Sequence, residues 1–187
     1  MNGHPRAALR RRPLLTPMWI SGVGALFFAL LLAYLWQTAA MTTVFVVRHA
    51  EKAVDGTRDP PLSAAGAARA ERLARLFGGS HPEQRLEVVY ATEFQRTRQT
   101  GRAVARHLRV PLEIQPAGDT AALAEHIKSH HRGGRVLVVG HSNTVPEIVQ
   151  SLGGPVLPAI ADDDYSRLYV VSVGLFSRTT VTELVQP

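Results

Sequence analysis

The sequence predicts an α/β protein with a mainly parallel sheet covered by helices on both faces. Two observations lead to this fold class. From Met41 onward, short runs of apolar and β-branched residues alternate with longer stretches whose apolar residues recur at helical spacing. Strands separated by helices usually pair in parallel, and a parallel sheet needs cover on both faces.

The elements follow one another in a regular order. The strand expected over 42–48 is rich in Val, and the helix over 63–77 begins at Ser63, a residue type that caps helices, and ends before Gly78 and Gly79. Asp119 is a possible N-cap of a later helix. The remaining expected elements are a strand over 86–91, a helix over 94–108, a short strand over 110–115, a helix from 119 to about 130, a strand over 136–140, a helix over 144–152, and a closing hairpin of strands 168–173 and 179–185. We expect 161–166 and the pair His130-His131 to be surface loops.

The chain is basic, but its charge is unevenly distributed. Its 187 residues have a formal net charge of +6. Residues 1–40 contain no Asp or Glu and supply +4 of this charge through Arg6, Arg10, Arg11 and Arg12. The rest of the chain is nearly balanced and shows no interleaved basic and aromatic patch, so nucleic-acid binding is not expected. The absence of cysteine excludes disulfides, thiolate metal sites and a cysteine nucleophile.

An uncharged segment over 18–36, MWISGVGALFFALLLAYLW, precedes the α/β region. As a helix it would extend roughly 28 Å, close to the thickness of a bilayer's hydrocarbon core. We therefore expect a single transmembrane anchor between a basic cytoplasmic tail over 1–17 and an outward-facing domain over 41–187. Two alternatives remain open: a signal peptide with small residues at 38–40, and a shorter cytoplasmic protein that starts at Met41.

Small residues recur along the same segment. Ser21, Ala25, Ala29 and Ala33 are spaced by four, which places them on one stripe of a helix. Small side chains permit close approach of helices in lipid, so a homodimer is a possible, weakly supported partnership.

Three expected strand ends carry similar polar residues. The first ends in Arg48-His49, the second leads to Glu93 and Arg96, and the strand over 136–140 leads to His141, Ser142 and Asn143. Parallel strands present their carboxyl ends at one edge of the sheet, where ligands of open α/β folds bind. We therefore expect two arginines and two histidines to lie together there.

Phosphoryl transfer is the chemistry that suits this set. Arginine binds phosphate oxygens with a planar fork and stays charged at any working pH. A neutral imidazole attacks phosphorus directly and carries the group covalently. Ser142, Asn143 and the helix that follows them add donors for phosphate. No cluster of acids suits Mg²⁺, because the side chains of the consecutive Asp162, Asp163 and Asp164 diverge.

The motifs RHAEK, LSxxG at 62–66, TEFQRTRQT and GHSNT resemble, in this order, those of the histidine phosphatase superfamily, also called phosphoglycerate mutase-like. The resemblance covers about 41–187. It implies a three-layer α/β/α sandwich that works without metal or other cofactor. It also implies that His49 becomes phosphohistidine and that Arg48, Arg96 and His141 form the phosphate pocket.

The residue that protonates the leaving group is not evident. Many members of the superfamily carry a Glu in an insertion after the second helix, and here that region, VPLEIQPAGDT, is short. Asp119 and Glu93 are the tentative acids. The short region predicts a compact member, similar in size to bacterial phosphohistidine phosphatases.

The expected function is therefore metal-independent hydrolysis of a phosphorylated small molecule or envelope component outside the cytoplasmic membrane. One alternative is a cytoplasmic phosphohistidine phosphatase that starts at Met41. Another is a phosphate-binding module with little or no turnover.

Overall fold

The structure of the protein, a computed structural model, describes residues 18–39, 41–79, 85–174 and 178–186. It divides into two compact units, Met1–Trp36 and Gln37–Pro187. The basic tail expected over 1–17 lies outside the described residues.

The helix α1, Met18–Ala39, forms the described part of the N-terminal unit, and its last three residues belong to the second unit. Its described apolar side chains, Phe27, Leu30 and Trp36 among them, are exposed. No helix in the described part of the chain is long and apolar enough to cross a membrane. The transmembrane span expected over 18–36 is therefore not supported.

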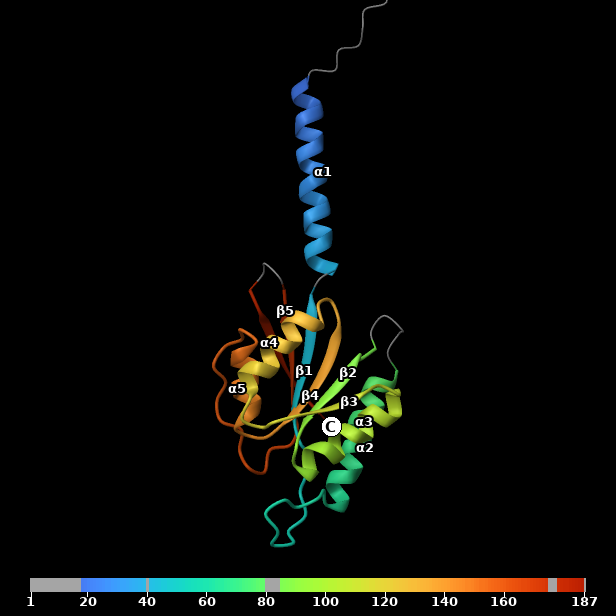
Figure 1. Ribbon diagram of the computed structural model, residues 1–187, viewed down its shortest axis with the longest axis vertical. Helices are drawn as coiled ribbons and strands as arrows, with labels where there is room; N and C mark the ends of the chain where they lie inside the picture. Colours follow the sequence, from blue (N-terminus) through green and yellow to red (C-terminus); the bar gives the residue numbers. More distant parts are fainter. Residues whose placement is uncertain (1–17, 40, 80–84, 175–177, 187) are drawn as a thin grey trace, which may run out of the picture. The chain divides into compact units, whose positions relative to one another are not determined.

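The second unit is built around a six-stranded mixed sheet (Figure 1). The strand order is β3-β2-β4-β1-β5-β6, in which β1, β2, β3 and β4 pair in parallel and β5 is antiparallel to both its neighbours. The expected closing hairpin is thus present as β5 and β6. The strands are β1 Thr42–Arg48, β2 Val88–Thr92, β3 Leu112–Gln115, β4 Arg135–Gly140, β5 Arg167–Val173 and β6 Thr180–Val185.

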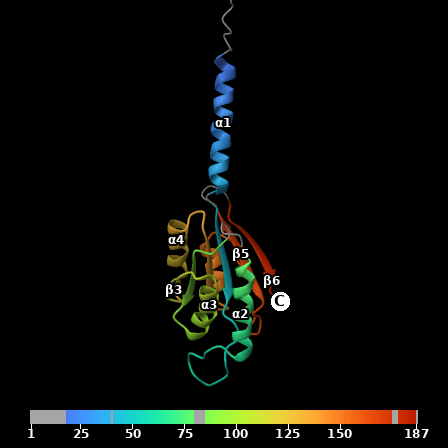
Figure 2. The ribbon, with the colours of Figure 1, turned by 90° about the vertical axis from the view of Figure 1, so that its right-hand side faces the viewer.

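Helices cover both faces of this sheet, which makes three layers (Figures 1 and 2). Alternate residues of a strand point to opposite faces, so Val44 and Val46 of β1 join one buried apolar cluster, whereas Val47 joins the other. The first cluster packs under α4, Thr120–His130, and α5, Thr144–Ser151. The second packs under α2, Ala64–Gly78, and α3, Gln95–Leu108.

Two helices begin where the sequence predicts, but only one of them is capped by a side chain. The Gly66 amide donates to the Ser63 hydroxyl over 3.0 Å, so Ser63 caps α2 as expected. Asp119 precedes α4, but its side chain makes no capping hydrogen bond. The expectation that Asp119 caps with its side chain is wrong, because its backbone at φ −98° and ψ 44° lies outside the extended region that N-caps adopt.

His131 is also not the solvated loop residue that was expected. Its side chain is 15% exposed, and it lies between the Tyr90 hydroxyl and the Glu87 carboxylate, at 2.8 Å from each. The Thr42 hydroxyl donates to its carbonyl. His131 therefore helps to join the start of β1 to the end of α4.

Candidate active site

The register of the sheet brings two histidines together. Arg48, the last residue of β1, pairs with Gly140, the last residue of β4. The His49 amide then donates to the Gly140 carbonyl over 2.9 Å, so His49 and His141 follow neighbouring strand ends. Their ring centroids are 5.3 Å apart. Gly140 leaves room for this arrangement, since a Cβ there would come within 2.8 Å of the Thr144 hydroxyl.

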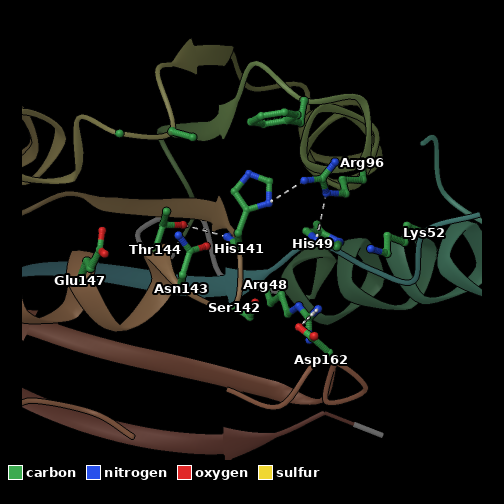
Figure 3. A pocket seen from close by; sticks show the side chains of 13 residues that line it. Arg48, His49, Lys52, Arg96, His141, Ser142, Asn143, Thr144, Glu147 and Asp162 are labelled. Atoms are coloured by element: carbon green, nitrogen blue, oxygen red, sulfur yellow. Dashed lines mark hydrogen bonds and ion pairs between the residues drawn. The ribbon is translucent and has the colours of Figure 1, made fainter. Parts of the chain in front are cut away.

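The hydrogen bonds of His49 define which ring nitrogen is free of a proton. Nδ1 is 2.7 Å from the carbonyl of Ala50, an acceptor, so Nδ1 carries the proton. Nε2 accepts from the Nε–H of Arg96 over 3.2 Å. An imidazole with this tautomer holds a lone pair on Nε2, directed toward Arg96 (Figure 3).

His141 is held in the opposite tautomer. Its Nδ1 faces an Arg96 terminal nitrogen at 3.4 Å, and an arginine can only donate. Its Nε2 therefore carries the proton, which it donates to the Thr92 hydroxyl over 2.9 Å. Thr92 in turn contacts the Thr97 hydroxyl at 2.7 Å, and Thr97 donates to the carbonyl of Phe94. This chain of buried hydroxyls fixes the ring at the end of β2.

Both imidazoles are neutral over the physiological range. Burial lowers the pKa of His49 from 6.5 to about 3, and the charges of His141, Arg96 and Arg48 lower it further, against the hydrogen bond to Ala50. Burial also lowers the pKa of His141 to about 4, again with help from Arg96 and Arg48. Burial, helped by the neighbouring arginines, keeps protons off both rings and leaves His49 nucleophilic.

Arg96 is oriented by a loop that the sequence analysis did not single out. Asp59 lies 3.5 Å from an Arg96 terminal nitrogen, and its carboxylate also accepts from the Gln95 amide over 2.9 Å. Asp59 thereby satisfies the first N–H of α3, where Phe94 provides no side-chain cap. The Phe94 ring lies 4.7 Å from the guanidinium of Arg96.

Arg48 contacts the segment 161–165, which was expected to be a plain surface loop. One of its terminal nitrogens donates to the carbonyls of Ala161 and Asp164 over 2.7 and 3.1 Å. Its guanidinium lies 4.4 Å from the centre of the Tyr165 ring. Asp162 is fully exposed, as a surface loop predicts, yet its carboxylate is 3.8 Å from the second terminal nitrogen of Arg48.

The two tentative acids do not reach the site. Glu93 is exposed, and its carboxylate accepts from the Ala117 amide over 2.9 Å. Asp119 is exposed at the start of α4. Neither is among the residues that line the cavity, whereas Glu147 and Asp162 are carboxylates that do line it.

A cavity of about 500 Å³ joins these groups. The predicted residues Arg48, His49, Arg96, His141, Ser142 and Asn143 all line it. Lys52 lines it too and lies beside His49, whereas Glu147 lies on the other side of His141 (Figure 3). Lys52 had a signal in the sequence, since it closes the RHAEK motif three residues after the nucleophile. Such a lining suits a small anion with several oxygens, such as a phosphoryl group.

Comparison with known proteins agrees with this interpretation of the site. Residues 44–117 match the sequence model of the histidine phosphatase superfamily (branch 1). This match and the fold support membership of the superfamily and the activity of a phosphoric monoester hydrolase of the histidine phosphatase type. No curated protein matches the chain.

Solved structures are similar in fold. The protein histidine phosphatase SixA complexed with tungstate is 24% identical, with a TM-score of 0.64, over 76% of this chain and 96% of that one. A putative phosphohistidine phosphatase SixA from Agrobacterium tumefaciens is 23% identical, with a TM-score of 0.58, over 77% and 97%. A mycobacterial glucosyl-3-phosphoglycerate phosphatase is 15% identical, with a TM-score of 0.61, over 79% and 100%.

Proposed function

We propose that the protein hydrolyses phosphomonoesters without a metal ion, through a phosphohistidine formed on His49. One observation carries this proposal: the hydrogen bond from His49 Nδ1 to the Ala50 carbonyl, which leaves the lone pair of Nε2 beside Arg96. The low pKa of His49, about 3, keeps that lone pair available at neutral pH.

In the first step, Nε2 of His49 attacks phosphorus. The N–P bond forms while the bond from phosphorus to the ester oxygen breaks, and the electron pair of that bond leaves with the oxygen. Arg48 and Arg96 lie beside the position of the three equatorial oxygens and offset their charge, whereas neutral His141 lines the cavity next to His49. The ring becomes cationic on phosphorylation, and its Nδ1–H, directed at the Ala50 carbonyl, stabilises this charge.

In the second step, water attacks the phosphorus of phosphohistidine. The P–N bond breaks, its electron pair returns to Nε2, and inorganic phosphate leaves. Both steps use the same cations, since the transferred group carries the same charge each time. The proton that neutralises the alcohol in the first step has two neighbouring sources among the described lining residues, Glu147 and Asp162.

A phosphohistidine phosphatase is the second candidate. The observation that favours it is that neither Glu93 nor Asp119 is among the residues that line the cavity. An imidazole leaves from phosphorus more readily than an alkoxide, so such a substrate requires less help from an acid. The neighbours named SixA agree with this alternative.

Replacement of His49 tests the proposed function. His49→Ala should abolish turnover of an aryl phosphate, because the covalent route is lost, whereas Arg48→Ala should retain a residual rate lower by about 10². Both proteins should keep the wild-type circular dichroism. A His49→Ala protein with wild-type turnover would show that the reaction does not proceed through this ring.

We further propose that residues 18–36 attach the chain to the cytoplasmic membrane, with the catalytic domain outside. The support is the uncharged sequence, the preceding arginines and the exposed apolar side chains of α1. A reporter that is active only in the periplasm, fused after Pro187, should be active in a bacterial host. A silent periplasmic fusion together with an active cytoplasmic one would favour the start at Met41.

A further inference from the structure

Arg48 is buried, and only part of its guanidinium is used by the protein. The residue is 8% exposed. Of its five N–H donors, the terminal nitrogen Nη1 uses its own on the carbonyls of Ala161 and Asp164. Nε is buried and has no partner among the described residues. An unpaired buried donor is costly, so this edge of Arg48 is an unfilled position for an acceptor.

The unfilled edge has the shape that a phosphoryl group requires. Nε and Nη2 point to the same side of a guanidinium and form its side-on fork, which binds two oxygens of one oxyanion. The nearest charged group to Nη2 is the exposed Asp162, at 3.8 Å, which is beyond hydrogen-bond distance. Because Arg48 lines the cavity beside His49, an anion in the cavity reaches Nη2 directly, and it completes the fork once the side chains that cover Nε shift slightly.

Tyr165 fixes the plane of that fork. Its ring lies 4.4 Å from the Arg48 guanidinium, within the range of a cation–π contact, and its centroid is 6.1 Å from that of His49. The two carbonyl contacts fix rotation within the plane, and the stacked ring restrains tilting out of it. Together they leave the guanidinium one orientation.

The loop that carries Tyr165 is itself anchored. The Asp164 carboxylate accepts from the Ser166 amide and hydroxyl, and it pairs with Arg167 at the start of β5. Arg167 also pairs with Glu183 of β6 over 2.7 Å. The position of Arg48 is thereby tied to the antiparallel hairpin of the sheet.

We propose that Tyr165 is a positioning residue, which holds Arg48 so that its Nε–Nη2 edge faces the phosphoryl group. This inference rests on the proposed function, in which Arg48 binds that group. Tyr165 acts through Arg48 and touches no reacting atom, so its effect exists only while Arg48 is present.

A double-mutant cycle on the full-length chain tests this dependence, with binding of inorganic phosphate measured by isothermal titration calorimetry. Tyr165→Leu keeps an apolar side chain but removes the ring, and it should weaken phosphate binding about tenfold, the factor that one desolvated cation–π contact corresponds to. In the Arg48→Ala background the same change should weaken binding by less than about twofold, because no contact is left to lose. Tyr165→Phe, which keeps the ring, should restore the affinity. Asp163→Ala is the matched control in the same loop, since Asp163 is exposed and outside the cavity lining.

An equal loss of affinity in both backgrounds would overturn the proposal, because it would show a structural effect that is independent of Arg48. Unchanged affinity in Tyr165→Leu would overturn it as well. A different result would refute the proposed function. If a His49→Ala protein still turns over substrate, the phosphohistidine route is refuted. The result of the double-mutant cycle is unaffected by that outcome, because binding of phosphate does not need the nucleophile.

Discussion

Acid should destabilise the domain through its two buried histidines. Burial lowers the pKa of His49 to about 3 and that of His141 to about 4 in the folded protein, whereas both titrate near 6.5 in an unfolded chain. Between these values the unfolded state binds a proton on each ring that the folded state does not bind. The free energy of unfolding is therefore unaffected by these groups above pH 6.5 and falls as the pH decreases toward the folded pKa values.

The size of this effect follows from the shifts. At pH 5, about 1.5 units below the pKa of histidine in the unfolded chain, protonation of each ring in the unfolded state lowers the free energy of unfolding by about 2 kcal/mol. This value follows from about 1.36 kcal/mol per pH unit. A domain is typically stable by about 5–15 kcal/mol, so the loss is large enough to measure. His49→Asn keeps a polar side chain that does not titrate. The difference in stability between pH 7 and pH 5 should be smaller by about 2 kcal/mol in this variant.

Urea unfolding at the two pH values measures the difference. Circular dichroism is the suitable signal, because the only two tryptophans, Trp19 and Trp36, lie outside the α/β domain. His107→Asn is the matched control, since His107 is an exposed histidine of α3. If His49→Asn loses as much stability on acidification as the wild type, then His49 is not held neutral by burial, and the reasoning about its nucleophilicity is refuted.

Three further outcomes follow from the site and its supports. Arg96→Ala should lower turnover by about 10², because the Arg96 guanidinium contacts both histidines. Arg98→Ala, at an exposed position of the same helix, should have little effect. Equal steady-state rates for these two variants would contradict this prediction. Turnover should survive EDTA, since the charge is offset by arginines, and a loss that Mg²⁺ restores would contradict the proposed mechanism. Gly66→Ala should lower the urea midpoint and destabilise the nucleophile loop, because the new Cβ would lie 2.1 Å from the Glu51 carbonyl oxygen; an unchanged midpoint would mean that the loop moves away at little cost.

The sequence predicted the order of strands and helices because each element buries one set of side chains with its own period. In β1 and β4 every second residue joins the same apolar cluster. Because both faces of these strands are buried, each strand is visible in the sequence as a continuous apolar run. A helix cap that comes from a residue far away in the sequence is not visible in this way. Asp59 lies 36 residues before Gln95, whose amide it accepts, and no local signal connects the two.

The acids mark a second limit. Asp119 was singled out because it lies nearest to the place where many superfamily members carry their acid, and Glu93 because it precedes Arg96 by one helical turn. In the fold, Glu93 accepts from the Ala117 amide and Asp119 precedes α4. Neither lines the cavity, although the neighbouring Ala117 and Gly118 do. Glu147, which does line it, lies on α5 within a pattern that reads only as an amphipathic helix. A carboxylate's distance from the phosphoryl group depends on loop paths, which periodicity does not encode.

Arg48 and His49 show how one strand end supplies two different functions. Consecutive residues of a strand point to opposite faces, which would separate the cation from the nucleophile. Here β1 ends at Arg48, and the His49 amide bonds to the Gly140 carbonyl of the neighbouring strand. The His49 ring therefore contacts Arg96 of α3, whereas the Arg48 side chain contacts the loop before β5. The two side chains are held by different parts of the fold and still line one cavity. Their geometry can therefore be perturbed separately, through Asp59 and Arg96 for His49 and through Tyr165 for Arg48.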